Sequence, residues 1–169
     1  QLAEIPLYRD VQTPDKLLLI AKLQDGKPAV FLLDTGSSIT TISSELGERL
    51  GLDIQRRPGR LVGIGGSTAW HGAGLEDLQL GPYTLQDVNV AVGVAGLPTH
   101  VGLVPLAGIL GNNVLSLFQV SIDYPANSMV LAQSGRPDPT PPHPIASALY
   151  PSRGAAAAVA VAAAAPVVR

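Results

Sequence analysis

Residues 29–33, Ala-Val-Phe-Leu-Leu, form an unbroken apolar run that ends at Asp34, and Thr35, Gly36 and Ser37 follow. A strand without a polar position is typical of one that is buried on both faces. An aspartate at the mouth of such a strand loses solvation, so it needs hydrogen-bond donors or a second acid that shares its proton. Gly36 lets the backbone approach the carboxylate, and Ser37 adds a hydroxyl donor. The run therefore predicts a buried strand that presents one carboxylate in a tight turn.

The rest of the first 133 residues alternates between short apolar runs and turns rich in glycine, proline and asparagine. Period-2 alternation and β-branched residues predict strands at residues 16–23, 27–33, 39–43, 88–94, 120–124 and 129–132. Two short helices are expected, the first capped by Ser44 and stopped by Gly51, the second capped by Asn112 or Asn113. The pattern predicts a mainly β fold, either closed or sandwich-like, with one or two short helices.

The composition changes near residue 134. Prolines crowd residues 137–144, and a run of alanine and valine follows at residues 154–169. Proline-rich sequence resists helix and sheet, and alanine buries little apolar area. The alanine-valine run is also shorter than the roughly 20 residues of a membrane-spanning helix. We therefore expect one folded domain at residues 2–133, a low-complexity tail or linker at residues 134–169, and no membrane span within this chain.

Charge and residue content exclude several classes of function. The chain has a net charge of -2 and no cluster of lysine or arginine, so a nucleic-acid interface has little support. It has no cysteine, which excludes disulfides and thiolate chemistry. The histidines, His71, His100 and His143, lack the paired spacing of a zinc site. The sequence thus predicts no nucleic-acid partner, no metal and no cofactor.

A second carboxylate beside Asp34 would give this turn a chemical use. Two adjacent carboxylates cannot both ionise cheaply, so one of them keeps a proton. The charged one can act as a base on a water molecule, while the protonated one acts as an acid toward a scissile carbonyl. The chain has a single Asp-Thr-Gly, at residues 34–36, so the second carboxylate would come from a second copy in a twofold dimer. The alternative is an ordinary aspartate turn, since aspartate and glycine are common in turns.

Residues 32–38, Leu-Leu-Asp-Thr-Gly-Ser-Ser, resemble the active-site signature of the retropepsin-like aspartic proteases, in their single-domain, bacterial form. Residues 108–118 are similar to that family's second apolar-apolar-glycine element and the short helix after it. Residues 62–70 stand where the family places its flap, and the hairpin expected after residue 119 looks like its closing hairpin. The resemblance covers residues 5–133. It implies a single acid-protease lobe, a closed β-barrel, that acts on peptide or protein substrates as a homodimer.

The resemblance also implies roles for individual residues. Asp34 is the catalytic aspartate, Thr35 bonds across the dimer, and Gly36 is the glycine that the turn requires. Ser37 is expected to donate a hydrogen bond to the carboxylate. The expected substrate-binding positions are Ser37, Gly63, Ile64, Gly65, Gly66, Ile109 and Gly111. With Leu110, the last two also match the strand and glycine that pack beside the active loop.

Two positions near these motifs carry separate expectations. Asn112 stands where viral members of the family often carry an arginine, so a salt bridge at that position is absent. Trp70, the only tryptophan, is either an anchor of the flap or a residue of the core.

Three functional interpretations follow. The first is an aspartic endopeptidase that acts as a homodimer. The second is a non-catalytic retropepsin-like module that binds peptides or regulates a partner, and the third is one lobe of a longer multidomain protease. The intact chemistry of the Asp-Thr-Gly turn favours the first. The tail and the absence of an initiating methionine favour an exported bacterial protein, periplasmic or secreted, over a cytoplasmic one.

Overall fold

The structure, a computed structural model, describes residues 2–55, 58–63 and 66–133, so the tail expected at residues 134–169 lies outside the described residues. Within these ranges the chain is mainly β, with two short helices, α1 (Ser44–Arg49) and α2 (Asn112–Leu115). The strands are β1 (Leu2–Pro6), β2 (Leu18–Leu23), β3 (Pro28–Leu33), β4 (Thr40–Ile42), β5 (Pro58–Gly63), β6 (Gly66–Leu80), β7 (Tyr83–Val92), β8 (His100–Val101), β9 (Val104–Pro105), β10 (Gly108–Leu110), β11 (Phe118–Asp123) and β12 (Ser128–Gln133). No helix of the described part is long and apolar enough to span a membrane.

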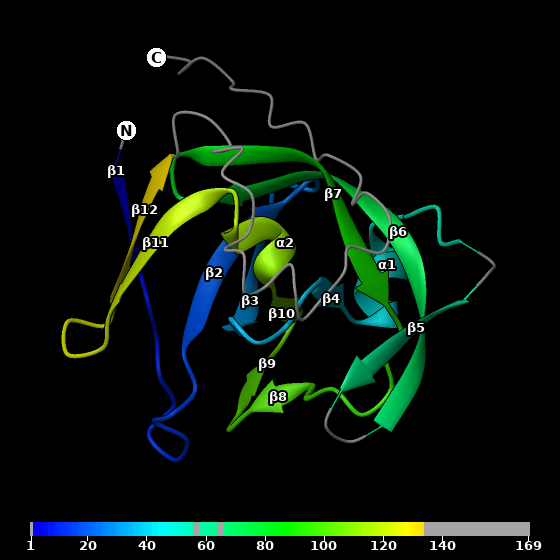
Figure 1. The fold of residues 1–169 in the computed structure, drawn as a ribbon, viewed down its shortest axis with the longest axis horizontal. Coiled ribbons are helices and arrows are strands. Elements are labelled where there is room, and N and C mark those ends of the chain that lie inside the picture. The colour runs from blue at the N-terminus through cyan, green and yellow to red at the C-terminus, as the bar shows by residue number, and fades with distance from the viewer. Residues whose placement is uncertain (1, 56–57, 64–65, 134–169) are drawn as a thin grey trace, which may run out of the picture.

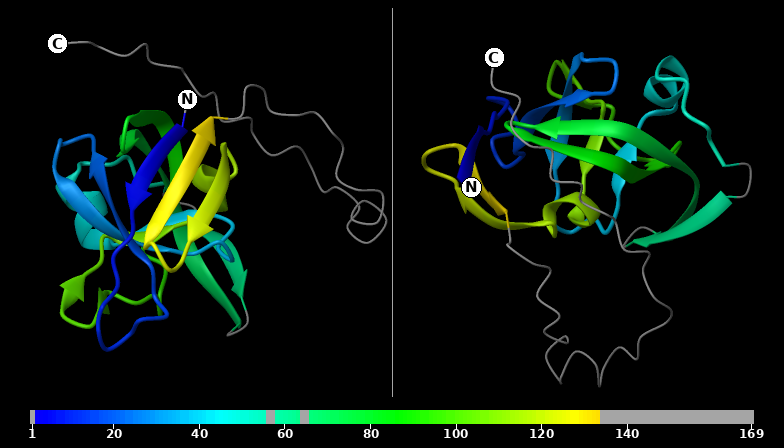
Figure 2. Two further views of the ribbon diagram at one scale, coloured as in Figure 1. Left: turned by 90° about the vertical axis from the view of Figure 1, so that its left-hand side faces the viewer. Right: turned by 90° about the horizontal axis from the view of Figure 1, so that it is seen from above.

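A closed barrel forms from β2, β3, β10, β4, β7 and β6, which pair in that order (Figure 1). The ring closes because β2 also pairs with β6, through Lys22 with Gln79 and Leu23 with Leu78. β5 extends this sheet as the hairpin partner of β6. Figures 1 and 2 show the β5–β6 hairpin and the β8–β9 hairpin projecting from the same end of the barrel. The mainly β, closed-barrel fold predicted from the sequence is confirmed.

The short strand β10 lies between β3 and β4 and joins distant parts of the chain. It runs parallel to β3, with Ile109 opposite Leu32, and antiparallel to β4, with Ile109 opposite Thr41. The first residue of β10 is Gly108, and only glycine fits at this position. A methyl group on Gly108 would overlap the carbonyl oxygen of Thr41. This three-strand arrangement places the chain segments after β3 and after β10 next to each other.

The two faces of these strands are covered by different apolar clusters. Phe31, Ile42 and Leu110 belong to the main core inside the barrel. Side chains alternate across a sheet, so their neighbours point outward. The outer cluster consists of Leu18, Leu32, Val101, Leu106 and Ile109. Full burial of one such large side chain stabilises the fold by about 1.5–3 kcal/mol, so both faces of β3 and β10 are held firmly.

A second, three-stranded sheet joins the two ends of the described chain. β12 lies in its middle and pairs antiparallel with β11 and with β1, so that Leu2 lies opposite Ala132 and Pro6 opposite Ser128. The hairpin expected after residue 119 is present as β11 and β12. β1 was not predicted from the sequence, and its alternating residues Ala3 and Ile5 are buried in the main core.

The start of the first helix differs by one residue from the prediction. The N-cap is Ser43, whose Oγ accepts a hydrogen bond from the backbone N–H of Leu46 at 3.1 Å. The expected cap, Ser44, is the first helical residue, so that prediction was wrong. Two adjacent serines have the same capping propensity, and sheet pairing decides between them. Ser43 still donates its backbone N–H to Ala107, at 3.0 Å, which keeps it extended as a cap must be.

Candidate functional site

Asp34 is the first residue after β3 and is half-buried. Its backbone N–H donates to the carbonyl oxygen of Leu110 at 3.2 Å, so the ladder between β3 and β10 continues one residue past the strand. The two buried strands therefore fix where the aspartate leaves the sheet. The predicted strand that presents one carboxylate in a turn is present.

The turn after Asp34 hydrogen-bonds to the aspartate itself. The backbone N–H of Gly36 donates to Asp34 Oδ1 at 2.8 Å, and the N–H of Ser37 donates to the Asp34 carbonyl at 3.2 Å. A side chain on Gly36 would place its Cβ 3.1 Å from Oδ1, which is a tight contact. One oxygen of Asp34 is thus held by the backbone.

The hydroxyl of Ser37 does not act as the sequence predicted. Its Oγ donates to the carbonyl oxygen of Ile39 at 2.8 Å, so its single proton is used within the loop. The expected donation to the Asp34 carboxylate was therefore wrong in this structure. The backbone N–H of Gly36 supplies the donor instead, because a glycine at that position lets the main chain fold back onto the carboxylate.

Two asparagines after β10 hold this loop, in roles that were not predicted from the sequence. Asn112 donates from Nδ2 to the carbonyl oxygen of Thr35 at 2.6 Å, and its backbone N–H donates to Ser37 at 2.8 Å. Neither asparagine caps α2, whose N-cap is Gly111 without a side-chain hydrogen bond, so that prediction was also wrong. Both side chains are engaged elsewhere, which explains the difference.

Asn113 connects three elements through its side-chain amide. Its Oδ1 accepts from the backbone N–H and from the hydroxyl of Thr40, at 2.7 and 2.8 Å, and its Nδ2 donates to the Asn89 carbonyl at 2.7 Å. The Thr40 hydroxyl also accepts from the N–H of Gly111 at 3.1 Å. β4, β7 and α2 are thereby tied together behind the Asp34 turn. The adjacent pair of asparagines after Ile-Leu-Gly was the available sequence signal.

The predicted residues of β10 lie next to the Asp34 turn. Ile109 and Gly111 are buried, and Leu110 accepts the hydrogen bond from Asp34. A Cβ on Gly111 would lie 2.6 Å from the carbonyl carbon and oxygen of Ile39, so only glycine fits against the loop. The resemblance implied that this strand and glycine pack beside the Asp34 loop, and the structure brings them together there.

The predicted flap falls on the hairpin of β5 and β6. Gly63 ends β5 and pairs with Gly66, which begins β6, while Ile64 and Gly65 lie outside the described residues. Trp70 is half-buried at the base of this hairpin and covers Gly59 on the opposite strand, where a Cβ would lie 2.5 Å from its Cε2. The tryptophan therefore anchors the hairpin.

No three His, Asp or Glu side chains in the described part of the chain gather closely enough to hold a metal ion. His71 instead contacts the Gln55 carbonyl through Nδ1 at 2.8 Å, and His100 contacts the Thr99 hydroxyl through Nδ1 at 3.1 Å. His143 lies outside the described residues. Each of the two described histidines thus has a local hydrogen-bond partner.

Comparison with known proteins gives two findings. The sequence model of a family described as "Aspartyl protease" matches residues 20–114, which include the Asp34 turn and β10. Among solved structures, the crystal structure of a retropepsin-like aspartic protease from Rickettsia conorii is similar, with a TM-score of 0.54 and 18% sequence identity over 78% of this chain and 90% of that one. A comparison with curated proteins found no match.

Proposed function

Because the chain belongs to the aspartyl protease family, we propose that it is an aspartic endopeptidase that works as a homodimer. The water that attacks the peptide bond is activated between the Asp34 carboxylates of the two copies. The substrates are peptides or proteins, and the family and the retropepsin-like fold support this proposal.

The proposal depends most on the hydrogen bonding of the two Asp34 carboxylate oxygens. Oδ1 is held by the Gly36 N–H at 2.8 Å, whereas Oδ2 has no hydrogen-bond partner among the described residues. A carboxylate oxygen without a partner in its own chain can accept from a water or share a proton with a second acid. Asp34 differs from an ordinary turn aspartate, which also accepts from the backbone through one oxygen, in its position directly after the buried strand β3 and beside β10.

A dimer is proposed because the chain contains one Asp-Thr-Gly sequence, at residues 34–36. In a twofold dimer the same surface of each copy meets the other, so the two Asp34 turns can face each other across the axis. Thr35 is exposed in the single chain, so its hydroxyl is available to the partner copy. Asn112 already holds the Thr35 carbonyl from within the chain.

The reaction needs one proton on the pair of carboxylates. The charged Asp34 takes a proton from the water while the water oxygen bonds to the scissile carbonyl carbon, and the protonated Asp34 gives its proton to the carbonyl oxygen. Collapse of the tetrahedral intermediate breaks the C–N bond: the amine takes the proton held by one Asp34, and a hydroxyl of the intermediate gives its proton to the other Asp34, which restores one proton on the pair. Water is the only co-reactant, and no covalent enzyme intermediate forms.

The residues proposed to bind substrate fall into two groups. The first group consists of Ser37 and of Ile109 and Gly111 on and after β10. The second group is the proposed flap, with Gly63 and Gly66, which pair at the ends of β5 and β6, and with Ile64 and Gly65 between them in the sequence. An extended peptide between them would be contacted by β10 on one side and by the hairpin on the other.

The proposal is tested by Asp34→Asn in the full chain. We expect cleavage of an unfolded protein at acidic pH to fall at least about 1,000-fold, because both members of the pair are lost at once. The fold should be retained, since the asparagine Oδ1 can still accept from the Gly36 N–H. Asp53→Asn, at an exposed position after α1, is the matched control and should keep wild-type activity.

Two results would contradict the proposal. A purified Asp34→Asn variant that cleaves at the wild-type rate would show that the activity comes from another site. A wild-type protein that folds, dimerises and cleaves no peptide would favour the non-catalytic binding module.

A further inference from the structure

A cavity of about 300 Å³ lies on the outer side of the barrel, away from the Asp34 turn. Its walls are the start of β3 at residues 28–30, the helix α1, and residues 105–107, which precede β10. Val30 lies four residues before Asp34 on the same strand, a distance of about 13 Å at about 3.3 Å per residue. The volume falls at the lower end of the roughly 300–1,000 Å³ of small-molecule sites.

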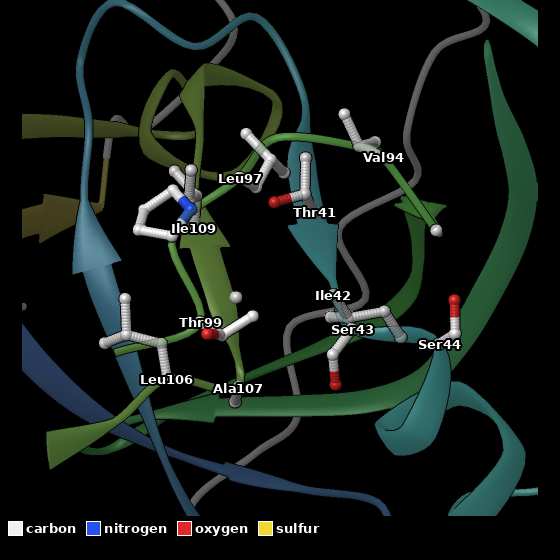
Figure 3. A pocket seen from close by; sticks show the side chains of 13 residues that line it. Thr41, Ile42, Ser43, Ser44, Val94, Leu97, Thr99, Leu106, Ala107 and Ile109 are labelled. Atoms are coloured by element: carbon white, nitrogen blue, oxygen red, sulfur yellow. The ribbon is translucent and has the colours of Figure 1, made fainter. Parts of the chain in front are cut away.

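This outer cavity adjoins a second one, of about 240 Å³, which Figure 3 shows from close by. The second cavity contains Ile109, one of the residues proposed to bind substrate. Ser43, Leu106 and Ala107 line both cavities. Figure 3 shows Ser43 and Ala107 at one end of the second cavity, away from Leu97. The outer cavity contains none of the predicted site residues, so it is a separate place at which a ligand can bind.

Most of the wall of the outer cavity is apolar. Ala29, Leu46 and Leu106 are buried, and Val30 and Ala107 are half-buried. Small-molecule sites are typically lined in this way, with a few polar groups that fix the orientation of the ligand. Covering such a wall with an apolar group removes apolar surface from water, which favours binding. The wall therefore suits a ligand with an apolar body.

Two charged side chains of α1 also line the outer cavity, and only one of them has a partner. Glu45 and Arg49 are four residues apart, a spacing at which opposite charges on a helix can pair. Arg49 contacts Asp25 instead, with its Nη2 3.6 Å from Oδ2. Glu45 is exposed and makes no ion pair or hydrogen bond through its carboxylate within the described chain. Because Asp25 balances Arg49, the carboxylate of Glu45 gives the cavity a net negative charge.

We propose that the outer cavity binds an organic cation: a primary ammonium on an apolar body of leucine or phenylalanine size. The body packs on the apolar wall, and the ammonium pairs with Glu45. An anion would meet that carboxylate without compensation, and a bare cation would leave the apolar wall uncovered. The ammonium belongs either to a small amine or to a lysine side chain of a polypeptide. The inference goes beyond the proposed function and does not depend on it.

The test is titration of the isotope-labelled full chain with phenethylammonium, followed through amide chemical shifts by NMR. We expect saturable shifts at Ala29, Leu46 and Arg49, which line only the outer cavity, with a dissociation constant on the order of 1 mM. Phenethyl alcohol, the neutral analogue, should bind about 2- to 5-fold more weakly, as expected for the loss of an exposed ion pair. Shifts confined to Thr41 and Ile109, which line only the second cavity, would overturn the inference. The absence of saturable shifts at about 10 mM would do the same.

Glu45→Gln keeps the shape of the side chain and removes its charge. It should weaken the binding of phenethylammonium about 2- to 5-fold, to the level of phenethyl alcohol, and leave the binding of the alcohol unchanged. Glu48→Gln is the matched control, because Glu48 is exposed on the same helix but does not line the cavity. It should keep the difference between the two probes. Equal affinity of the wild type for both probes, or equal losses in both variants, would reject the pairing with Glu45.

Two capped tripeptides distinguish the two sources of the ammonium. One carries lysine between two leucines, and the other carries glutamine in place of the lysine. They are titrated into Asp34→Asn so that cleavage does not interfere. If the lysine peptide shifts Ala29 and Arg49 at lower concentration than phenethylammonium does, the site is supported as one for a polypeptide. The reverse order, or equal binding of the two peptides, supports it as a site for a small amine.

Discussion

At the residue scale, the geometry of the Asp34 turn depends on main-chain carbonyls and amides that side chains from elsewhere hold in place. Asn112 is the clearest case, because its amide reaches from the start of α2 to the Thr35 carbonyl at 2.6 Å. Thr35 lies between the carboxylate and Gly36, whose N–H bonds to that carboxylate. A shift of the Thr35 peptide would therefore change the position of the Asp34 carboxylate.

Asn112→Asp should lower activity with little loss of stability. The carboxylate has nearly the same shape as the amide but cannot donate to the Thr35 carbonyl, so the hydrogen bond is replaced by repulsion. Loss of one hydrogen bond is worth about 1 kcal/mol, and displacement of a catalytic group adds to it, so we expect kcat/KM to fall about 10- to 100-fold. Peptide cleavage kinetics and thermal unfolding of the same samples check this.

Asn89→Asp is the control for that charge change. Asn89 is exposed, and the network uses only its main-chain carbonyl, as the acceptor for Asn113. Its kcat/KM should stay within about twofold of the wild type, since surface substitutions away from such networks are usually nearly neutral. Equal losses in both variants would argue that added negative charge, and not the Thr35 contact, lowers activity.

The hydrogen-bond partners of these side chains are harder to predict from the sequence than the carboxylate itself. The apolar run before Asp34 and the glycine after it indicate the turn through local rules of burial and backbone freedom. Ser37, Asn112 and Asn113 each have several acceptors and donors within reach of a flexible polar side chain. Which partner is used depends on where β10 and α2 lie, and that is fixed by packing between distant segments.

At the element scale, β10 connects the site to the barrel, and its first residue must be glycine. Gly108→Ala should destabilise the fold by about 3 kcal/mol or more, because the methyl group would overlap the Thr41 carbonyl and push β10 away from β4. Urea unfolding followed by circular dichroism measures this change. Displacing β10 would also move Leu110, which accepts the Asp34 N–H.

Gly74→Ala tests whether glycine loss in a strand is enough to explain such an effect. Gly74 lies in β6, is exposed, and has no atom within 4 Å of the position that a Cβ would take. Its unfolding free energy should change by less than about 1 kcal/mol. If both variants are equally stable, the close approach of β10 and β4 does not matter for the fold.

Strands whose own residues form an apolar or alternating pattern could be predicted. Strands that depend on pairing with a distant segment of the chain could not. β3 and the β11–β12 hairpin carry apolar or alternating patterns that identify strands on their own. β1 is five residues long and contains Glu4 and Pro6, so its own sequence gives a weak strand signal. It becomes a strand because it pairs with β12 at the other end of the described chain.

At the scale of the whole molecule, the proposed site is incomplete in one chain. In the proposed dimer the barrel supplies one carboxylate, the turn that holds it and a flap hairpin, and the second carboxylate would come from a second copy. The sequence indicates this stoichiometry through its single Asp-Thr-Gly at residues 34–36. It does not give the strength of the dimer, which depends on how well two copies of one surface fit each other.

Mixed dimers measure that stoichiometry directly. Wild type and Asp34→Asn are unfolded together, refolded and assayed at a constant total concentration. If both Asp34 residues of a dimer are needed, only dimers of two wild-type chains are active, and an equal mixture keeps about one quarter of the activity. Replacing Asp34→Asn by Asp53→Asn in the mixture should leave full activity. Activity proportional to the wild-type fraction, about one half in an equal mixture, would mean that each chain works alone and would overturn the shared site.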